Sequence, residues 1–177
     1  MGAYYFSNWW WVRSFDFAER REIILSEKKH KALSLGAYVK KRNGVPLGSN
    51  ESLKNMLVNS LGAGTFAGFW RYWNPIWSYY LSRYIMRPLG TILPHWLAII
   101  FTFAISGLLH DLAISLIKLK PIVFITPWFV LMGMVVVIFE RLSVSYRGQV
   151  FFIRAFINVS IIGCCYWFSR VLFGVSS

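Results

Sequence analysis

Charged residues are scarce in this sequence, and acidic residues are the scarcest of them. Of the 177 residues, 15% are charged, and seven Asp and Glu stand against 19 Lys and Arg. Soluble globular domains are about 25% charged and about 45–50% apolar. Here 56% of the residues are hydrophobic and 19% are aromatic, and the mean hydropathy is +0.50. This composition excludes an ordinary soluble domain and a disordered chain, and it predicts a membrane protein.

Cysteine is also nearly absent, with Cys164 and Cys165 adjacent in an apolar stretch. A disulfide between neighbouring residues is strained, and a zinc site needs more ligands than this pair supplies. We therefore expect two buried, unpaired thiols and no metal site.

The excess of basic residues gives a net charge of +12. On a polar surface, such a charge would suggest a nucleic-acid partner. These basic residues instead alternate with Trp and Tyr beside long apolar runs, a mixture typical of the lipid headgroup layer. The expected partner is therefore the lipid bilayer, and no nucleic acid.

Charge and hydropathy divide the sequence into three regions. Residues 1–65 form a basic, aromatic N-terminal extension, for which we predict loops and short helices and no removable signal peptide. Residues 66–93 form an amphipathic segment rich in Trp, Tyr and Arg, which suits the membrane interface. Residues 94–177 form a membrane domain.

The membrane domain contains three windows of about 20 predominantly apolar residues, the length that crosses a bilayer. They lie near residues 96–117, 121–139 and 151–173. The predicted fold is therefore all-α: an integral membrane protein with about three transmembrane helices, an interfacial amphipathic helix and a basic N-terminal extension. More basic residues flank the windows on the side of the N-terminal segment, which predicts that this segment is cytoplasmic. Those on its side are Arg83, Arg87, Arg141 and Arg147, and those on the other side are Lys118 and Lys120.

Aromatic side chains within residues 66–93 recur at helical spacing and share one face. A single helix is interrupted at Pro75, because proline lacks the N–H and disfavours helical geometry in the residue before it. We predict a break at Asn74, with Asn74 as the N-cap of a new helix that begins at Pro75. The residues on the shared face are Phe66, Phe69, Trp70, Trp73, Trp77, Tyr80, Leu81 and Tyr84.

Two ionisable residues, His110 and Asp111, interrupt the first apolar window. Ionisable groups inside a membrane are costly and commonly functional. The helix face before His110 carries Thr102, Ser106 and Gly107, so it is expected to admit a second helix or to line a cavity. Asp111 points about 100° away from His110 and is not expected to orient its ring. A structural interpretation stays open, in which His110 bonds across a helix interface and Asp111 pairs with a nearby Arg.

Two stretches together resemble a known family. The sequence FWRYWNPIWSYYLSRYIMRPLG covers residues 69–90, and ISGLLHD covers residues 105–111. They resemble the core of the membrane-bound O-acyltransferase family, in which an aromatic and basic segment carries an Asn, Asp or His and a later membrane helix carries a nearly invariant His. Asn74 matches the first of these positions, and His110 matches the second. Further matches are Trp70, Arg71, Trp73 and the Arg-Pro-Leu-Gly sequence that begins at Arg87.

The resemblance implies transfer of an acyl group from a thioester, commonly acyl-CoA, to a hydroxyl acceptor. It implies that His110 is the general base and that Asn74 orients the acceptor or donates to the thioester carbonyl. It implies no cofactor, because the thioester is a substrate. The two arginines among the matching residues also have an alternative interpretation as interfacial anchors. Substrate contacts are expected from Trp70, Arg71, Trp73 and Arg87.

Members of that family are usually more than twice as long, with eight or more membrane segments around a reaction chamber. The resemblance therefore implies a split or reduced member that is completed by other membrane protein subunits. The alternative is a non-catalytic subunit of a larger membrane complex that retains the motif. A third alternative is a piece of a channel or transporter in which His110 and Asp111 carry protons.

Overall fold

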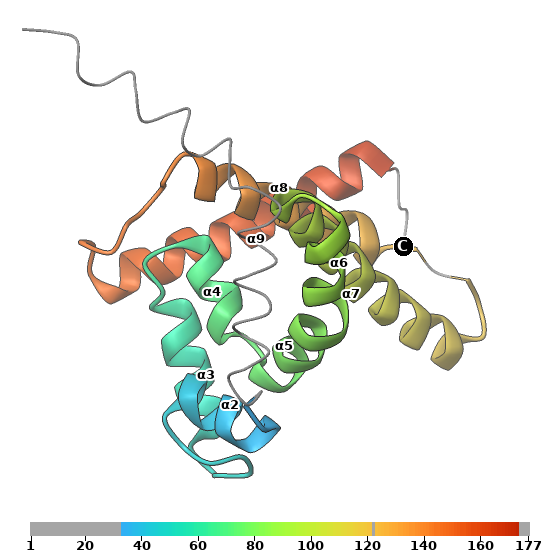
Figure 1. The fold of residues 1–177 in the computed structure, drawn as a ribbon. Helices are drawn as coiled ribbons and strands as arrows, with labels where there is room; N and C mark the ends of the chain where they lie inside the picture. Colours follow the sequence, from blue (N-terminus) through green and yellow to red (C-terminus); the bar gives the residue numbers. More distant parts are fainter. Residues whose placement is uncertain (1–32, 122, 174–177) are drawn as a thin grey trace, which may run out of the picture. The chain divides into compact units, whose positions relative to one another are not determined.

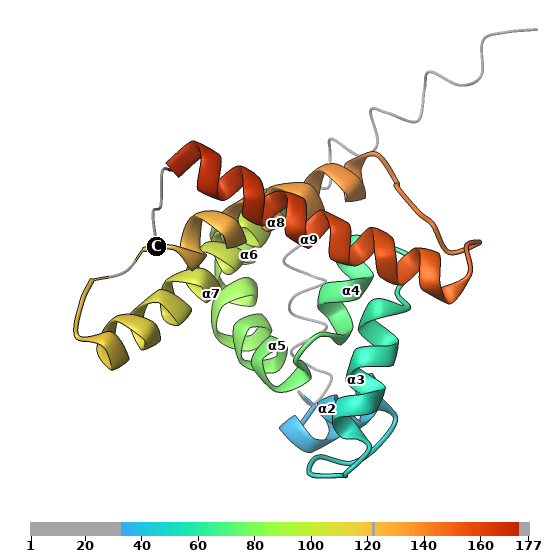
Figure 2. The ribbon, with the colours of Figure 1, turned by 180° about the vertical axis from the view of Figure 1, so that it is seen from behind.

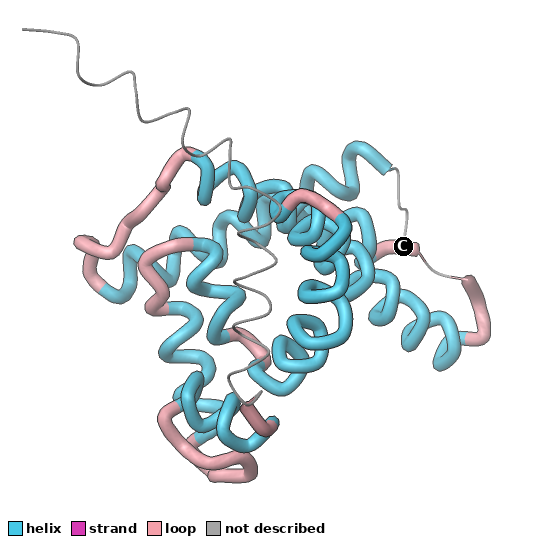
Figure 3. Tube along the Cα trace, viewed as in Figure 1, coloured by secondary structure: helices cyan, strands magenta, loops and turns pink. Residues whose placement is uncertain are grey.

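The described part of the chain consists of helices and loops, without a strand. The computed structural model describes residues 33–121 and 123–173 (Figure 1; Figure 3). This confirms the predicted all-α fold of an integral membrane protein. The prediction that no signal peptide is present falls on residues 1–32, outside the described residues. The helices are α2 (Leu35–Asn43), α3 (Ser52–Leu61), α4 (Phe66–Tyr72), α5 (Pro75–Leu81), the π-helix η1 (Ser82–Met86), α6 (Arg87–Ile92), α7 (His95–Lys118), α8 (Ile125–Arg141) and α9 (Phe151–Phe173).

Among the described residues, two helices are long and apolar enough to cross a membrane, where the sequence predicts about three. They are α7, with 24 residues, and α9, with 23. The middle window contains α8, which has 17 residues. At about 1.5 Å per residue, α8 spans roughly 26 Å of a hydrocarbon layer about 30 Å thick. The helix is shorter than predicted because it begins only at Ile125.

Helices α7 and α8 pack closely because each presents a glycine to the other. A Cβ atom at Gly107 of α7 would lie 2.7 Å from Cα of Thr126, and one at Gly133 of α8 would lie 3.0 Å from Cβ of Phe103. Both distances are shorter than a normal contact, so a larger side chain at Gly107 would push the helices apart. The prediction that the small face of α7 admits a second helix is confirmed.

Asp111 of α7 caps the first turn of α8. Its carboxylate accepts hydrogen bonds from the backbone N–H groups of Phe124 (3.0 Å), Ile125 (2.7 Å) and Thr126 (2.8 Å). It also accepts one from the Thr126 hydroxyl at 2.6 Å, and Asp111 is only 1% exposed. The first N–H groups of a helix lack partners within the helix, and negative charge is favourable there. The expected pairing of Asp111 with an Arg is therefore wrong, because the α8 N-terminus satisfies this carboxylate.

Helix α9 crosses α8 and reaches α3 (Figure 2). Its fully buried Asn158 donates to the carbonyl oxygens of Leu61 and Ala63, both at 3.1 Å, and accepts from the Tyr146 hydroxyl at 2.5 Å. The Tyr146 backbone N–H donates to the Gly64 carbonyl at 2.9 Å. These bonds fix the glycine-rich loop between α3 and α4 against α9 and the α8–α9 loop.

The adjacent thiols of α9 are free, as expected, but only one is buried. Cys165 faces the core and Cys164 is exposed. Successive residues of a helix point about 100° apart, so a helix that packs along one side cannot bury both. The prediction of two buried thiols is wrong for Cys164.

The segment 66–93 breaks at Asn74, as predicted. Helix α4 ends at Tyr72, and Asn74 adopts a left-handed conformation with φ 41° and ψ 73°. The Asn74 Oδ1 atom accepts a hydrogen bond from the Trp77 backbone N–H at 3.2 Å, and Pro75 is the first residue of α5. The N-cap prediction is confirmed.

The predicted common aromatic face does not persist through this segment. Phe66 and Phe69 are buried, whereas Tyr80 is 44% exposed and Tyr84 is 62% exposed. The break at Asn74 and the π-helical turn η1 both change the angle between successive side chains, so one helical wheel cannot describe residues 66–84.

Candidate functional site

A cavity of about 230 Å³ lies where α4, α5, η1, α7 and α8 meet, with one residue contributed by α2. Four of the six residues predicted to be catalytic or to contact substrate line it: Trp70, Trp73, Asn74 and His110. Asn74 and His110 are 36 positions apart in the chain, and the fold brings them to one cavity. The other lining residues are Tyr38, Trp77, Ser78, Leu81, Ser82, Met86, Thr102, Phe103, Ser106 and Phe129.

His110 is held by its own helix and by two aromatic rings. Its Nδ1 atom lies 2.6 Å from the carbonyl oxygen of Ser106, one turn earlier in α7. Its ring contacts Trp77 edge to face at 5.6 Å and Phe129 at 5.3 Å between ring centroids. The expected hydrogen bond of His110 across a helix interface is replaced by this bond within α7, and the contacts across the interface are made by the rings.

This geometry assigns the tautomer of the neutral imidazole. A carbonyl oxygen only accepts hydrogen bonds, so the proton must be on Nδ1. The Nε2 atom of His110 then carries the lone pair, and no described residue forms a hydrogen bond with it. The imidazole is thus oriented to accept a proton at Nε2.

Trp77 connects His110 to Asn74. Its indole N–H donates to the Ser106 hydroxyl at 2.9 Å, and its ring packs on His110. Its backbone N–H donates to the Asn74 side chain. The sequence pattern indicates for Trp77 only a place on the aromatic face, although its position three residues after the N-cap is the one that donates a capping bond.

Asn74 presents a free donor to the cavity. The cap bond to Trp77 occupies Oδ1, so the Nδ2 group, which has two N–H donors, has no partner among the described residues. Asn is one of the few residues other than Gly that tolerate a left-handed conformation. Asn therefore tolerates the left-handed backbone conformation at this position and also supplies a hydrogen-bond donor.

Two of the three tryptophans that line the cavity, Trp70 and Trp73, pack against neighbouring aromatic rings. Trp70 contacts Phe69 and Phe103, both at 5.1 Å between centroids. Its indole N–H is buried and has no hydrogen-bond partner in the described chain. Trp73 stacks on Phe69 at 5.4 Å and is 36% exposed. Trp70 therefore contributes an apolar ring face to the cavity, and its N–H is enclosed by the protein.

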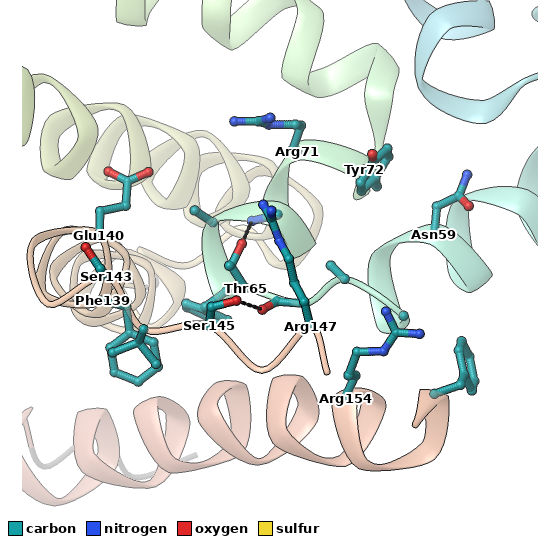
Figure 4. A pocket seen from close by; sticks show the side chains of 18 of the residues that line it. Asn59, Thr65, Arg71, Tyr72, Phe139, Glu140, Ser143, Ser145, Arg147 and Arg154 are labelled. Carbon is teal, nitrogen blue, oxygen red and sulfur yellow. Dashed lines mark hydrogen bonds between the residues drawn. The ribbon is translucent and has the colours of Figure 1, made fainter. Parts of the chain in front are cut away.

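The two arginines predicted to contact substrate lie away from this cavity. Arg71 follows Trp70 on α4 and points to the opposite side of that helix, where it lines a second cavity of about 860 Å³ (Figure 4). Arg87 is exposed at the start of α6 and lines neither cavity. Within the described ranges, no group of three or more His, Cys, Asp or Glu side chains is placed to hold a metal ion.

Chemically, the first cavity combines a proton acceptor with a hydrogen-bond donor in an aromatic wall. The acceptor is Nε2 of His110, and the donor is Nδ2 of Asn74. A base beside a donor for a developing negative charge is the arrangement that acyl transfer requires.

Comparison with known families gives one match. The family described as MBOAT, membrane-bound O-acyltransferase family, matches residues 6–175. Comparisons with curated proteins and with solved structures give no match. The matched range covers nearly the whole chain and includes both Asn74 and His110, so the chain belongs to the membrane-bound O-acyltransferase family.

Proposed function

We propose that the 230 Å³ cavity is the site at which an acyl group passes from a thioester to a hydroxyl acceptor. The observation that carries this proposal is the hydrogen bond of His110, whose Nδ1–H is held by the Ser106 carbonyl, so that Nε2 is the proton-accepting atom of a side chain that lines the same cavity as Asn74. Membership of the family supports the same class of reaction.

In the proposed reaction, Nε2 of His110 accepts the proton of the acceptor hydroxyl as its oxygen attacks the thioester carbonyl. The carbonyl oxygen becomes negatively charged and receives hydrogen bonds from Nδ2 of Asn74. Collapse of this intermediate breaks the carbon–sulfur bond, and the thiolate takes the proton from Nε2. The products are an ester and a free thiol, and His110 returns to its neutral form.

We assign acyl-CoA or a similar thioester as the donor, and no further cofactor. Trp70 and Trp73 would surround the acyl group next to the thioester, because their rings form part of the apolar wall. Arg71 and Arg87 lie off the cavity, so they would contact the donor only through parts remote from the reacting bond, or act as interfacial anchors.

We further propose that α7 and α9 cross the bilayer with the first residues of both helices on the cytoplasmic side. The guanidinium carbon of Arg141, at the end of α8, lies 5.6 Å from the ring centroid of Trp96, at the start of α7. This contact puts the two helix ends at one level. Arg141 and Arg147 therefore lie on the same side as the α7 N-terminus, and a surplus of Arg and Lys favours the cytoplasmic side.

Partner membrane subunits would complete the wall of the chamber. Asn74 and Trp73 are both exposed while lining the cavity, so the described residues leave this side open. The same observation favours the second candidate function, a non-catalytic subunit that uses this face for assembly alone.

A measurement of thioester cleavage separates the two candidates. The full chain is purified with its co-purifying membrane subunits in lipid nanodiscs, and thiol release from acyl-CoA is followed in the presence of a membrane lipid extract. His110→Ala is expected to lower the rate by roughly 10²–10⁴-fold, the usual contribution of a general base. The matched control is His95→Ala, because His95 is exposed at the start of α7 and lines neither cavity. Equal rates for the two variants would favour the non-catalytic subunit.

A further inference from the structure

The 860 Å³ cavity has a basic lining that takes no part in the proposed acyl transfer, apart from a contact of Arg71 with a remote part of the donor. It lies between the α3–α4 loop, the α8–α9 loop and the start of α9. Arg71, Arg147 and Arg154 line it, against the single carboxylate of Glu140 (Figure 4). Arg71 and Trp70 are consecutive residues of α4 that line different cavities, so this second cavity is separate from that of His110.

The three guanidinium groups have no acidic partner within the described chain. No ion pair joins Arg71, Arg147 or Arg154 to any described carboxylate, and Glu140 stands apart from all three in Figure 4. The Nε atom of Arg154 is buried without a hydrogen-bond acceptor. Three cationic side chains around one cavity with a single carboxylate in its lining favour an anionic ligand.

The position of Arg147 is fixed by the loops that pack beneath it. A Cβ atom at Gly64 would lie 2.2 Å from Cγ of Arg147, so only glycine leaves room for this side chain. The neighbouring Tyr146 donates from its backbone N–H to Gly64 and from its hydroxyl to buried Asn158. Arg147 is therefore attached to a hydrogen-bonded framework and extends from it toward Arg71 (Figure 4).

The residues around the cavity indicate which class of anionic ligand would bind there. The planar guanidinium group pairs with phosphate through two parallel hydrogen bonds. Phe139 and Phe151 line the cavity beside the arginines. The first turns of α9 expose Phe152 (81%) and Phe156 (73%) on a side of the helix that does not line the cavity. A ligand with a phosphate in the cavity and acyl chains that pass Phe151 onto the outer side of α9 would contact both surfaces.

We propose that Arg71, Arg147 and Arg154 bind the phosphate of an anionic phospholipid, with its acyl chains against the outer face of α9. This site is independent of the proposed acyl transfer, since it shares no lining residue with the His110 cavity. A soluble phosphate compound presents the same chemical group, so the test must distinguish the two sources.

The experiment measures lipid retention by the full chain, with its co-purifying subunits, in phosphatidylcholine nanodiscs containing a small fraction of phosphatidylglycerol. Retained lipid is counted by native mass spectrometry after release from the disc. Arg147→Gln and Arg154→Gln are each expected to lower the preference for phosphatidylglycerol by about tenfold. Arg141→Gln is the matched control, because it removes the same charge on the same side of the membrane from a residue outside the cavity. Its expected effect is less than about twofold, since Arg141 does not line the cavity and so would not contact the phosphate.

Two results would overturn the proposal. One is equal retention of phosphatidylglycerol by the wild type, Arg147→Gln and Arg154→Gln. The other is binding of inorganic pyrophosphate in pure phosphatidylcholine discs that depends on Arg147, without any preference for phosphatidylglycerol, which would assign the site to a soluble phosphate. If Arg147→Gln does not fold, Arg147→Lys replaces it, and loss of the planar fork is expected to weaken retention while the charge is kept.

Discussion

Asn74 carries a structural and a chemical role on different atoms of one side chain. Oδ1 caps α5, and Nδ2 is free at the cavity. The cap could be predicted from the sequence, because Asn followed by Pro is a local signal. The position of the free Nδ2 donor at the cavity could not be predicted from the sequence, because it depends on the packing of α7 opposite Asn74. Substitutions that keep one atom and lose the other separate these roles.

Asn74→Asp keeps the cap oxygen and removes the Nδ2 donor. We expect the thermal stability to change by less than about 0.5 kcal/mol, since Asp caps as well as Asn. We expect the acyl-transfer rate to fall by roughly 10²–10³-fold, as for loss of an oxyanion donor. Asn74→Ala loses both atoms and is expected to cost about 1 kcal/mol of stability in addition. Full activity in Asn74→Asp would show that Nδ2 of Asn74 takes no part in the reaction.

Tyr146 gives the α8–α9 loop a pH dependence. Burial raises the pKa of the Tyr146 phenol to about 12, against about 10 in an unfolded chain. Between these values the unfolded state loses the proton and the folded state keeps it, so the free energy of unfolding falls as the pH rises from 10 to 12. Below pH 10 the stabilisation by the bond to Asn158 is fully present.

Tyr146→Phe tests this dependence. We expect the variant to be less stable than the wild type at pH 8 by about 1 kcal/mol, because the hydrogen bond to Asn158 is lost. The difference between the two proteins should shrink between pH 10 and 12, as followed by thermal unfolding in detergent. A difference that stays constant over this range would show that the phenol titrates normally.

At the scale of elements, the pairing of α7 with α8 positions the ring that faces His110. Phe129 contacts the His110 ring and lies one turn after the Asp111 cap. The sequence could not predict where α8 begins, because its cap comes from α7, 14 residues earlier than Ile125. It did predict that Asp111 would not orient the His110 ring, because consecutive residues of a helix diverge.

Asp111→Asn is expected to destabilise the protein and to slow acyl transfer. The amide keeps one acceptor but turns a donor toward the N–H groups of α8, so the expected loss is about 2–4 kcal/mol, by comparison with other buried charged hydrogen bonds. Thr126→Val removes only one of the four bonds to Asp111 and is expected to cost about 1 kcal/mol. Chemical unfolding in detergent measures both. An equal, small loss of stability in the two variants would contradict the role of Asp111 as the cap of α8.

The region between α4 and α6 shows where sequence patterns stop being informative. The helical wheel placed Phe66 and Phe69 on one face, and both are buried together because α4 is regular up to Tyr72. It failed at Tyr80 and Tyr84, because a break and a π-helical turn follow. Neither the rotation of η1 nor the basic cavity of Arg147 and Arg154 has a local signal in the sequence.

At the scale of the whole molecule, composition alone predicted a helical membrane protein, and family membership now agrees with it. Composition could not predict the cavity, because its walls come from helices spread between Tyr38 and Phe129. The resemblance to the family selected Asn74 and His110, and the fold places both on one cavity. The central claim is that His110 acts there as a base.

The most direct test is the kinetics of His110→Gln at varied acyl-CoA concentration, with the full chain and any subunits that co-purify with it in nanodiscs. Glutamine fills a similar volume but cannot act as a general base at neutral pH. We predict that kcat falls by roughly 10²–10⁴-fold while KM stays within about threefold, because the donor contacts remain. A kcat equal to that of His95→Ala would contradict the account.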